Sequence, residues 1–119
     1  MTRDDVLALT DSQLVAAVAK KVMWFTVNPS NSPMSAPWMS GGVAAFFNPL
    51  EEPRDIAKVI TIMRGRGFRF QRMDHQELVS VAVWSIERGP QAVANVSGPF
   101  IDEAKLVLQA SLIAVEGCG

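Results

Sequence analysis

The sequence of 119 residues contains a single cysteine, a single histidine and no long uninterrupted apolar run. One thiol, Cys118, cannot form a disulfide within the chain, so the fold does not depend on an oxidising compartment. No segment approaches the roughly 18 apolar residues of a membrane span. The opening Met1-Thr-Arg-Asp-Asp5 is acidic where a signal peptide is basic and then apolar. We therefore expect a cytoplasmic protein without a membrane partner.

Neither sign of charge predominates, because 11 basic and 12 acidic residues leave a net charge of −1. This balance supplies no overall field that would draw the protein to DNA or RNA, so extended nucleic acid is an unexpected partner. Apolar residues make up 49% of the chain and charged residues 19%, which is typical of a folded domain with a real core. The length fits one domain, and we predict a single α+β domain over residues 1–119.

Motifs for catalysis, metal binding and cofactor binding are absent from the sequence. His75 lies in a polar turn, whereas a metal site needs more than one well-placed ligand. Gly41-Gly42 and Gly65-Arg-Gly67 are too short to count as a phosphate-binding loop, and no such loop with a lysine is present. Neither a nucleophile elbow nor a Cys–His pair occurs. We therefore predict that the protein is not an enzyme and needs no cofactor or metal.

The first half of the chain divides into a helical part and a loop. Residues 1–24 are predicted to be helical, because Thr2 and Thr10 fit N-cap positions and apolar residues follow at helical spacing. Residues 25–47 are rich in proline and asparagine and have no regular period, which favours a long loop. A short strand at 43–47 remains open as an alternative to a buried loop segment.

The second half, residues 48–116, is predicted to form a helix, three strands and a helix, followed by a tail at 117–119. The first of these helices begins at Pro53. Alternation and valine content predict strands at 68–73, 78–86 and 91–96. Gly98-Pro99 is expected to start the last helix, whose predicted buried side includes Ile101 and Leu108.

Short turns between the three strands require antiparallel pairing, and each helix must bury an apolar stripe. The sequence therefore predicts an α+β fold, a three-layer helix–antiparallel sheet–helix sandwich with the order α-(β)-α-β-β-β-α.

Three pieces of the chain carry a resemblance to a known family. They are Val18-Ala-Lys-Lys-Val-Met-Trp24, Asp55-Ile-Ala-Lys-Val-Ile-Thr-Ile-Met-Arg-Gly-Arg-Gly-Phe68 and Ala110-Ser-Leu-Ile-Ala114. In these pieces and their order the chain resembles the phage ABA sandwich domain family, from about Met1 to Glu116. The resemblance implies a small phage or prophage protein in the cytoplasm of a bacterial host, a helix–sheet–helix sandwich and no known catalytic residues.

Arginines and phenylalanines are interleaved at the end of the second predicted helix and in the strand that follows. Arginine forks bind phosphate or carboxylate, and aromatic rings stack on bases. Because side chains alternate between the faces of a strand, Arg69 and Arg72 should face opposite ways. An ordinary helix end with a solvent-facing strand therefore stands as the alternative to an anion site. The candidate residues are Arg64, Arg66, Arg69 and Arg72.

The predicted loop adds two indole rings and several amides. Trp24, Asn28 and Trp38 suit a small-ligand pocket or a protein interface. The alternative is a loop folded over the core, with its tryptophans as plugs.

These features together predict a non-enzymatic accessory protein that binds and sequesters a small anionic, nucleotide-like ligand and so helps a phage to evade host defence. The predicted ligand contacts are the four arginines with Trp24, Asn28 and Trp38. A protein that inhibits a host enzyme or defence factor by binding it is the alternative, favoured by the apolar loop residues Met34 and Met39. The small, apolar-rich chain with an open sheet edge also predicts a homo-oligomer.

Overall fold

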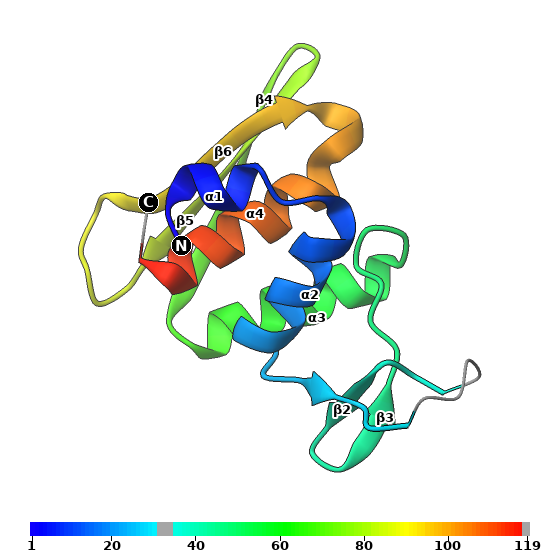
Figure 1. Ribbon diagram of the computed structural model, residues 1–119. Helices are drawn as coiled ribbons and strands as arrows, with labels where there is room; N and C mark the ends of the chain where they lie inside the picture. Colours follow the sequence, from blue (N-terminus) through cyan, green and yellow to red (C-terminus); the bar gives the residue numbers. More distant parts are fainter. Residues whose placement is uncertain (31–34, 118–119) are drawn as a thin grey trace.

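The computed structural model describes residues 1–30 and 35–117, which form helices and two antiparallel sheets of three strands each (Figure 1). The helices are α1 (Arg3–Leu7), α2 (Asp11–Lys21), α3 (Pro53–Gly65) and α4 (Glu103–Glu116), with a 3-10 helix, η1, at Phe100–Asp102. The strands are β1 (Thr26–Val27), β2 (Trp38–Ser40), β3 (Val43–Ala45), β4 (Phe68–His75), β5 (Leu78–Ser85) and β6 (Ala92–Pro99). The predicted mixture of helices and antiparallel strands is confirmed. Within the described residues, no helix is long and apolar enough to cross a membrane.

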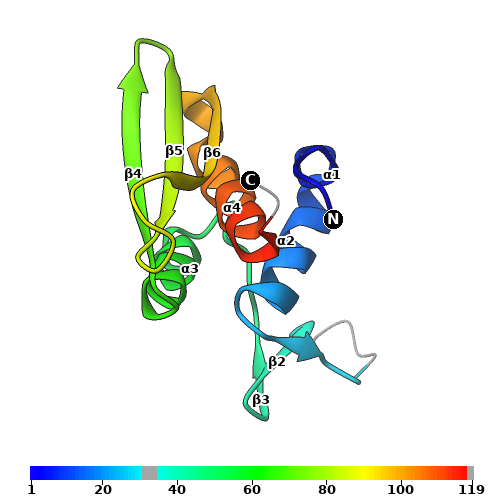
Figure 2. The ribbon, with the colours of Figure 1, turned by 90° about the vertical axis from the view of Figure 1, so that its left-hand side faces the viewer.

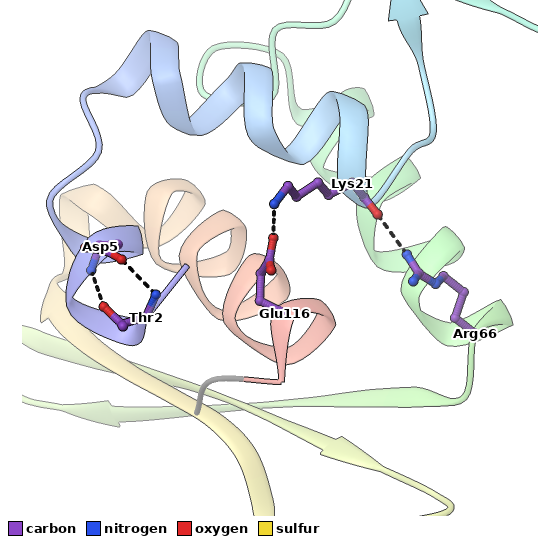
Figure 3. A network of polar contacts seen from close by, with 5 residues as sticks. All are labelled: Thr2, Asp5, Lys21, Arg66 and Glu116. Carbon is purple, nitrogen blue, oxygen red and sulfur yellow. Dashed lines mark hydrogen bonds and ion pairs between the residues drawn. The ribbon is translucent and has the colours of Figure 1, made fainter.

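Thr2 and Thr10 occupy the predicted N-cap positions of the first two helices, and both form capping boxes. The Thr2 hydroxyl accepts a hydrogen bond from the Asp5 backbone N–H at 3.1 Å, and the Asp5 carboxylate accepts one from the Thr2 N–H at 2.9 Å (Figure 3). These bonds favour the charged carboxylate and lower the pKa of Asp5. Thr10 and Gln13 form the same pair of bonds at the start of α2. This helix ends at Lys21, three residues before the predicted end.

Strands β4, β5 and β6 form an antiparallel meander that supports the main core. Val79, Val81 and Val83 project from one face of β5 and are almost completely buried. On that side α4 packs against β5 and β6, and on its other side it packs against α2. Because α4 has neighbours on both sides, its residues 106–114 are all buried.

The layers are stacked with α4 in the middle. Figure 2 shows the β4–β5–β6 sheet, α4 and α2 in succession, and α1 also packs on α4. The helix–sheet–helix order predicted from the sequence is not confirmed, because in this arrangement α4 lies between the sheet and α2. Two helix layers occur here because α4 is apolar on nearly all sides and can cover the sheet and α2 at once.

The segment 25–47, predicted to be a long loop, contains a second sheet. Its strands pair in the order β1-β2-β3, and Ser40 pairs with Val43 across Gly41-Gly42. Both glycines have positive φ values of 57° and 85°, as a two-residue hairpin turn requires. The open question at 43–47 is thus answered by a strand at 43–45. Strands of two or three residues are too short to show alternation, which is why the pattern predicts a loop.

The start of the last helix differs from the prediction. Gly98 and Pro99 belong to β6, where Pro99 pairs with Leu78, and α4 begins only at Glu103. Ile101 lies in η1 between them and is 89% exposed, whereas a buried position was predicted. The strand pairing continues to Pro99 and therefore moves the helix start by several residues, which changes the face that Ile101 occupies.

Candidate functional site

The seven residues predicted to bind a ligand lie in separate places. Arg66 and Trp24 meet where α2 ends, and Arg64 and Arg69 meet where α3 passes into β4. Arg72 faces the helices beside a cavity, while Asn28 and Trp38 belong to the small sheet region. The structure therefore brings together two pairs of the predicted residues and does not form one site from all seven.

Arg66 completes the C-terminal end of α2. Its Nη1 donates to the carbonyl oxygen of Lys21 at 3.2 Å (Figure 3) and to that of Val22 at 3.4 Å. These two oxygens lack partners within the helix. Its guanidinium carbon lies 4.6 Å from the centroid of the Trp24 ring. Trp24 itself has a φ of 58°, a left-handed conformation that is unfavourable for a bulky residue. The pair holds the chain where it reverses from α2 towards β1.

We expect Arg66→Ala to lower the free energy of unfolding by about 1–2 kcal/mol, because it removes two hydrogen bonds and a cation–π contact. Arg64→Ala is the matched control, since this exposed arginine lies two residues away and its side chain has no hydrogen bond within the described residues. Urea denaturation measures the free energy of unfolding of both variants. Equal effects of the two substitutions would contradict the capping role.

Arg69 is also engaged by backbone carbonyls. Its Nη1 donates to the carbonyl oxygens of Arg64 and Phe68 at 3.1 and 2.7 Å. It lies opposite Trp84 in the register of β4 and β5, whereas Arg72 lies opposite the buried Val81. The predicted opposite orientation of Arg69 and Arg72 is therefore confirmed.

Asn28 and Trp38 make internal contacts. The Asn28 side chain donates to the carbonyl oxygen of Ala36 at 2.6 Å and accepts from the backbone N–H of Ser30 at 3.1 Å. Trp38 is only 9% exposed and belongs to the main hydrophobic core. Of the two methionines assigned to a protein interface, Met39 is half-buried and Met34 lies outside the described residues. In this loop the structure favours the tryptophan-plug interpretation for Trp38.

Arg72 has the richest polar surroundings of the four arginines. Its Nε donates to the Glu103 carboxylate, and its Nη1 lies 2.9 Å from the Asp74 carboxylate. The guanidinium carbon lies 5.3 Å from the centroid of the Phe100 ring. The hydrogen bond to Glu103 is the main cause that raises the pKa of Arg72 above its ordinary value, so this side chain carries a fixed positive charge.

A cavity of about 420 Å³ opens beside Arg72, between α3, the sheet and the start of α4. Its volume falls within the range of about 300–1,000 Å³ for small-molecule sites. Arg72, Glu103 and Glu51 supply charged groups to its lining. Its apolar lining includes Ile56, Ile60, Phe70, Val81 and Val107. Sequence reasoning missed the cavity because its walls form only when α4 and the 49–51 segment pack beside α3, β4 and β5, which no local pattern reports.

A metal centre has no support within the described residues, where no group of three or more histidine, cysteine, aspartate or glutamate side chains is placed to hold an ion.

Comparisons of this chain with protein-family models, with curated proteins and with solved structures found no match. The arrangement of its own residues is therefore the basis for a functional proposal.

Proposed function

We propose that the protein binds a small molecule that has an apolar ring and one anionic group, such as a nucleotide-like compound, in the cavity beside Arg72. The observation that carries this proposal is the cavity itself, which combines apolar walls with a fixed guanidinium. Phe70 and Ile60 offer surfaces on which a ring packs, and Arg72 offers a partner for a carboxylate or phosphate.

An anionic ligand would compete with a carboxylate of the protein. Glu103 occupies Nε of Arg72 and Asp74 occupies Nη1, while Nη2 has no hydrogen-bond partner within the described part of the chain. Glu103 is at the same time one of the residues that line the cavity. The ligand anion would take the place of Glu103 on the guanidinium fork and leave the Arg72–Asp74 pair in position.

Substitutions that remove the charge of Arg72 or of Glu103 test the proposal. We expect Arg72→Gln to weaken binding about 10- to 100-fold, because a hydrogen bond to a charged group contributes about 1.5–3 kcal/mol. Glu103→Gln should strengthen binding, because it removes the competing carboxylate. Arg88→Gln, in an exposed turn away from the cavity, is the matched control and should leave the affinity unchanged.

The ligand is first sought by heat release and mass spectrometry of the protein purified from host cells. Isothermal titration with the released compound, or with nucleoside mono- and diphosphates, then gives the affinities of the variants. A stronger affinity of Arg72→Gln, or a weaker one of Glu103→Gln, would show that the cavity prefers cations and would contradict the proposal.

Inhibition of a host enzyme or defence factor by direct contact is the second candidate function. The observation that favours it is the exposure of large apolar side chains around the small sheet, with Trp24 67% and Phe46 73% exposed. A pull-down from host lysate that retains no enzyme or defence factor would count against this candidate.

We also propose a place for the protein among small, non-enzymatic phage or prophage accessory proteins of the bacterial cytoplasm, related to the phage ABA sandwich family. The helix–three strands–helix order of residues 48–116 supports this relationship. A role in evasion of host defence is part of the same proposal. Loss of defence evasion in a phage that lacks this gene is the corresponding test.

A further inference from the structure

Most of the exposed large apolar side chains come from elements at two ends of the molecule. Twelve large apolar residues are exposed within the described part of the chain, and nine of them lie on one surface or the other. The first surface, here called the arm surface, comprises Trp24, Val27, Val43, Phe46 and Ile62. The second, here called the tip surface, comprises Met73, Leu78, Phe100 and Ile101 at the β4–β5 end of the sheet, where Met73 and Leu78 lie on the face away from the helices and Phe100 lies beside Arg72 on the other face. Isolated apolar residues on a surface need no explanation, but two clusters do.

The arm surface combines apolar groups with positive charge. Phe46 and Ile62 line one groove of about 510 Å³ between the small sheet and α3, and the Arg66 guanidinium lies on the Trp24 ring. The segments that carry this surface, 20–27, 43–46 and 58–66, contain five basic residues and no acidic residue. Two carboxylates of the neighbouring segment, Glu52 and Asp55, also lie near Phe46, together with Arg54 and Lys58, so basic groups remain in excess. One of the five, Lys21, is paired with Glu116 (Figure 3). The arm surface is therefore a basic, apolar face.

The tip surface combines apolar groups with negative charge. Leu78 pairs with Pro99, and the Phe100 N–H donates to the Glu77 carbonyl oxygen at 3.1 Å, so η1 lies beside the β4–β5 turn. The segments that carry this surface, 72–78 and 99–103, contain four acidic residues and one arginine. The tip surface is therefore an acidic, apolar face.

The two surfaces lie at opposite ends of the molecule. In Figures 1 and 2 the β4–β5 turn forms the upper end and the small sheet forms the lower end, and the second view is turned about the vertical axis. The molecule is also elongated, with principal extents of 44 × 32 × 25 Å. One contact between two copies related by a two-fold axis, arm on arm or tip on tip, would bring like charges together and leave the other surface exposed.

We propose that the arm surface of one copy binds the tip surface of a second copy, so that the chain assembles head to tail. Opposite charges then meet around an apolar centre, and apolar side chains of both ends lose exposed area. A head-to-tail contact is heterologous, so it closes into a ring or continues as a filament. This assembly does not depend on the ligand cavity beside Arg72.

Sedimentation analysis of the oligomeric state tests the proposal, with variants that each change only one of the two surfaces (single-surface variants). Phe46→Ser removes the most exposed large apolar side chain of the arm surface and Ile101→Ser that of the tip surface, and both side chains are too exposed to be needed for folding. Ile86→Ser is the matched control, because Ile86 is 62% exposed but lies on neither surface. Circular dichroism establishes that each variant keeps its fold.

The wild-type protein and Ile86→Ser should form species larger than dimers from low micromolar to near-millimolar concentration, and high salt should weaken them. Phe46→Ser and Ile101→Ser should each remain monomeric, with the self-association constant reduced by at least about tenfold. A mixture of the two should form a one-to-one dimer and nothing larger, because only one intact contact can be made.

Two results would overturn the proposal. The first is a wild-type protein that stays monomeric over the whole concentration range, which would assign these surfaces to other partners. The second is a single-surface variant that dimerises by itself as strongly as the wild type, which would show a two-fold contact.

Discussion

Replacing Leu108 with alanine is expected to lower the free energy of unfolding by about 3–4 kcal/mol, because a large cavity would open in a fully buried site. Leu108 has no exposed surface and lies in α4, which packs on the sheet at one side and on α2 at the other. Few neighbours there are free to collapse into the space that a lost isobutyl group leaves. Urea denaturation followed by circular dichroism measures the loss.

Ile101→Ala is the control that makes this result informative. Helical spacing in the sequence predicts that Ile101 and Leu108 share a buried side, whereas the structure leaves Ile101 89% exposed. We therefore expect the control to change the stability by less than about 0.5 kcal/mol. Similar losses for both variants would mean that the helix begins at Pro99, as the sequence pattern predicts, and that the strand pairing of Pro99 with Leu78 does not form.

The elements that sequence reasoning predicts correctly are those set by neighbouring residues. The capping boxes at Thr2 and Thr10 depend on side chains three residues apart, and the helix from Pro53 is set by a favourable first position and a regular apolar face. The strands β4, β5 and β6 are eight residues each, long enough to show alternation or valine enrichment. Local signals of this kind do not need the rest of the chain.

The small sheet was not predicted because its strands hold no pattern of their own. The one local signal is Gly41-Gly42, because two adjacent glycines fit a two-residue hairpin turn as well as a fragment of a phosphate-binding loop. The stacking order of the layers was missed for a related reason. The apolar spacing of the last helix predicts one buried side, but residues 106–115 include only two polar residues, Gln109 and Ser111, and the helix is buried against α2 as well as against the sheet.

The candidate site was predicted less well than the fold. Residue type identifies arginine as an anion binder, but the partners of Arg66 and Arg69 are backbone carbonyls, which every sequence offers and no motif reports. The position of Arg72 beside a cavity depends on Glu103, which is 31 residues away in the sequence. The alternation of side chains along β4 correctly predicts that Arg72 and Arg69 face opposite sides of the sheet. No other feature of the site follows from a strand pattern.

Replacing Trp38 with alanine is expected to cost about 3–5 kcal/mol of stability, the usual loss for a buried indole. Trp38 pairs with Val27 and Ala45 in the small sheet and shares a hollow with Val15 and Leu50, so it joins this sheet to α2. Trp38→Phe keeps an apolar ring in the same place and should lose less. Urea denaturation gives the two values directly.

The same two variants show whether Trp38 serves to fill the core or to contact a ligand. If Trp38 stacked on a bound base, alanine would abolish binding and leave the stability of the ligand-free protein almost unchanged. Because Trp38 is 9% exposed and lies in the core, we expect the reverse: a large loss of stability, with Trp38→Phe retaining the affinity for the ligand of the Arg72 cavity. Trp24 is the matched comparison, since 67% of it is exposed, and Trp24→Phe should change neither quantity strongly. A stable Trp38→Ala protein would show that the small sheet is not anchored through this residue. The Trp38 ring would then again be a candidate ligand contact.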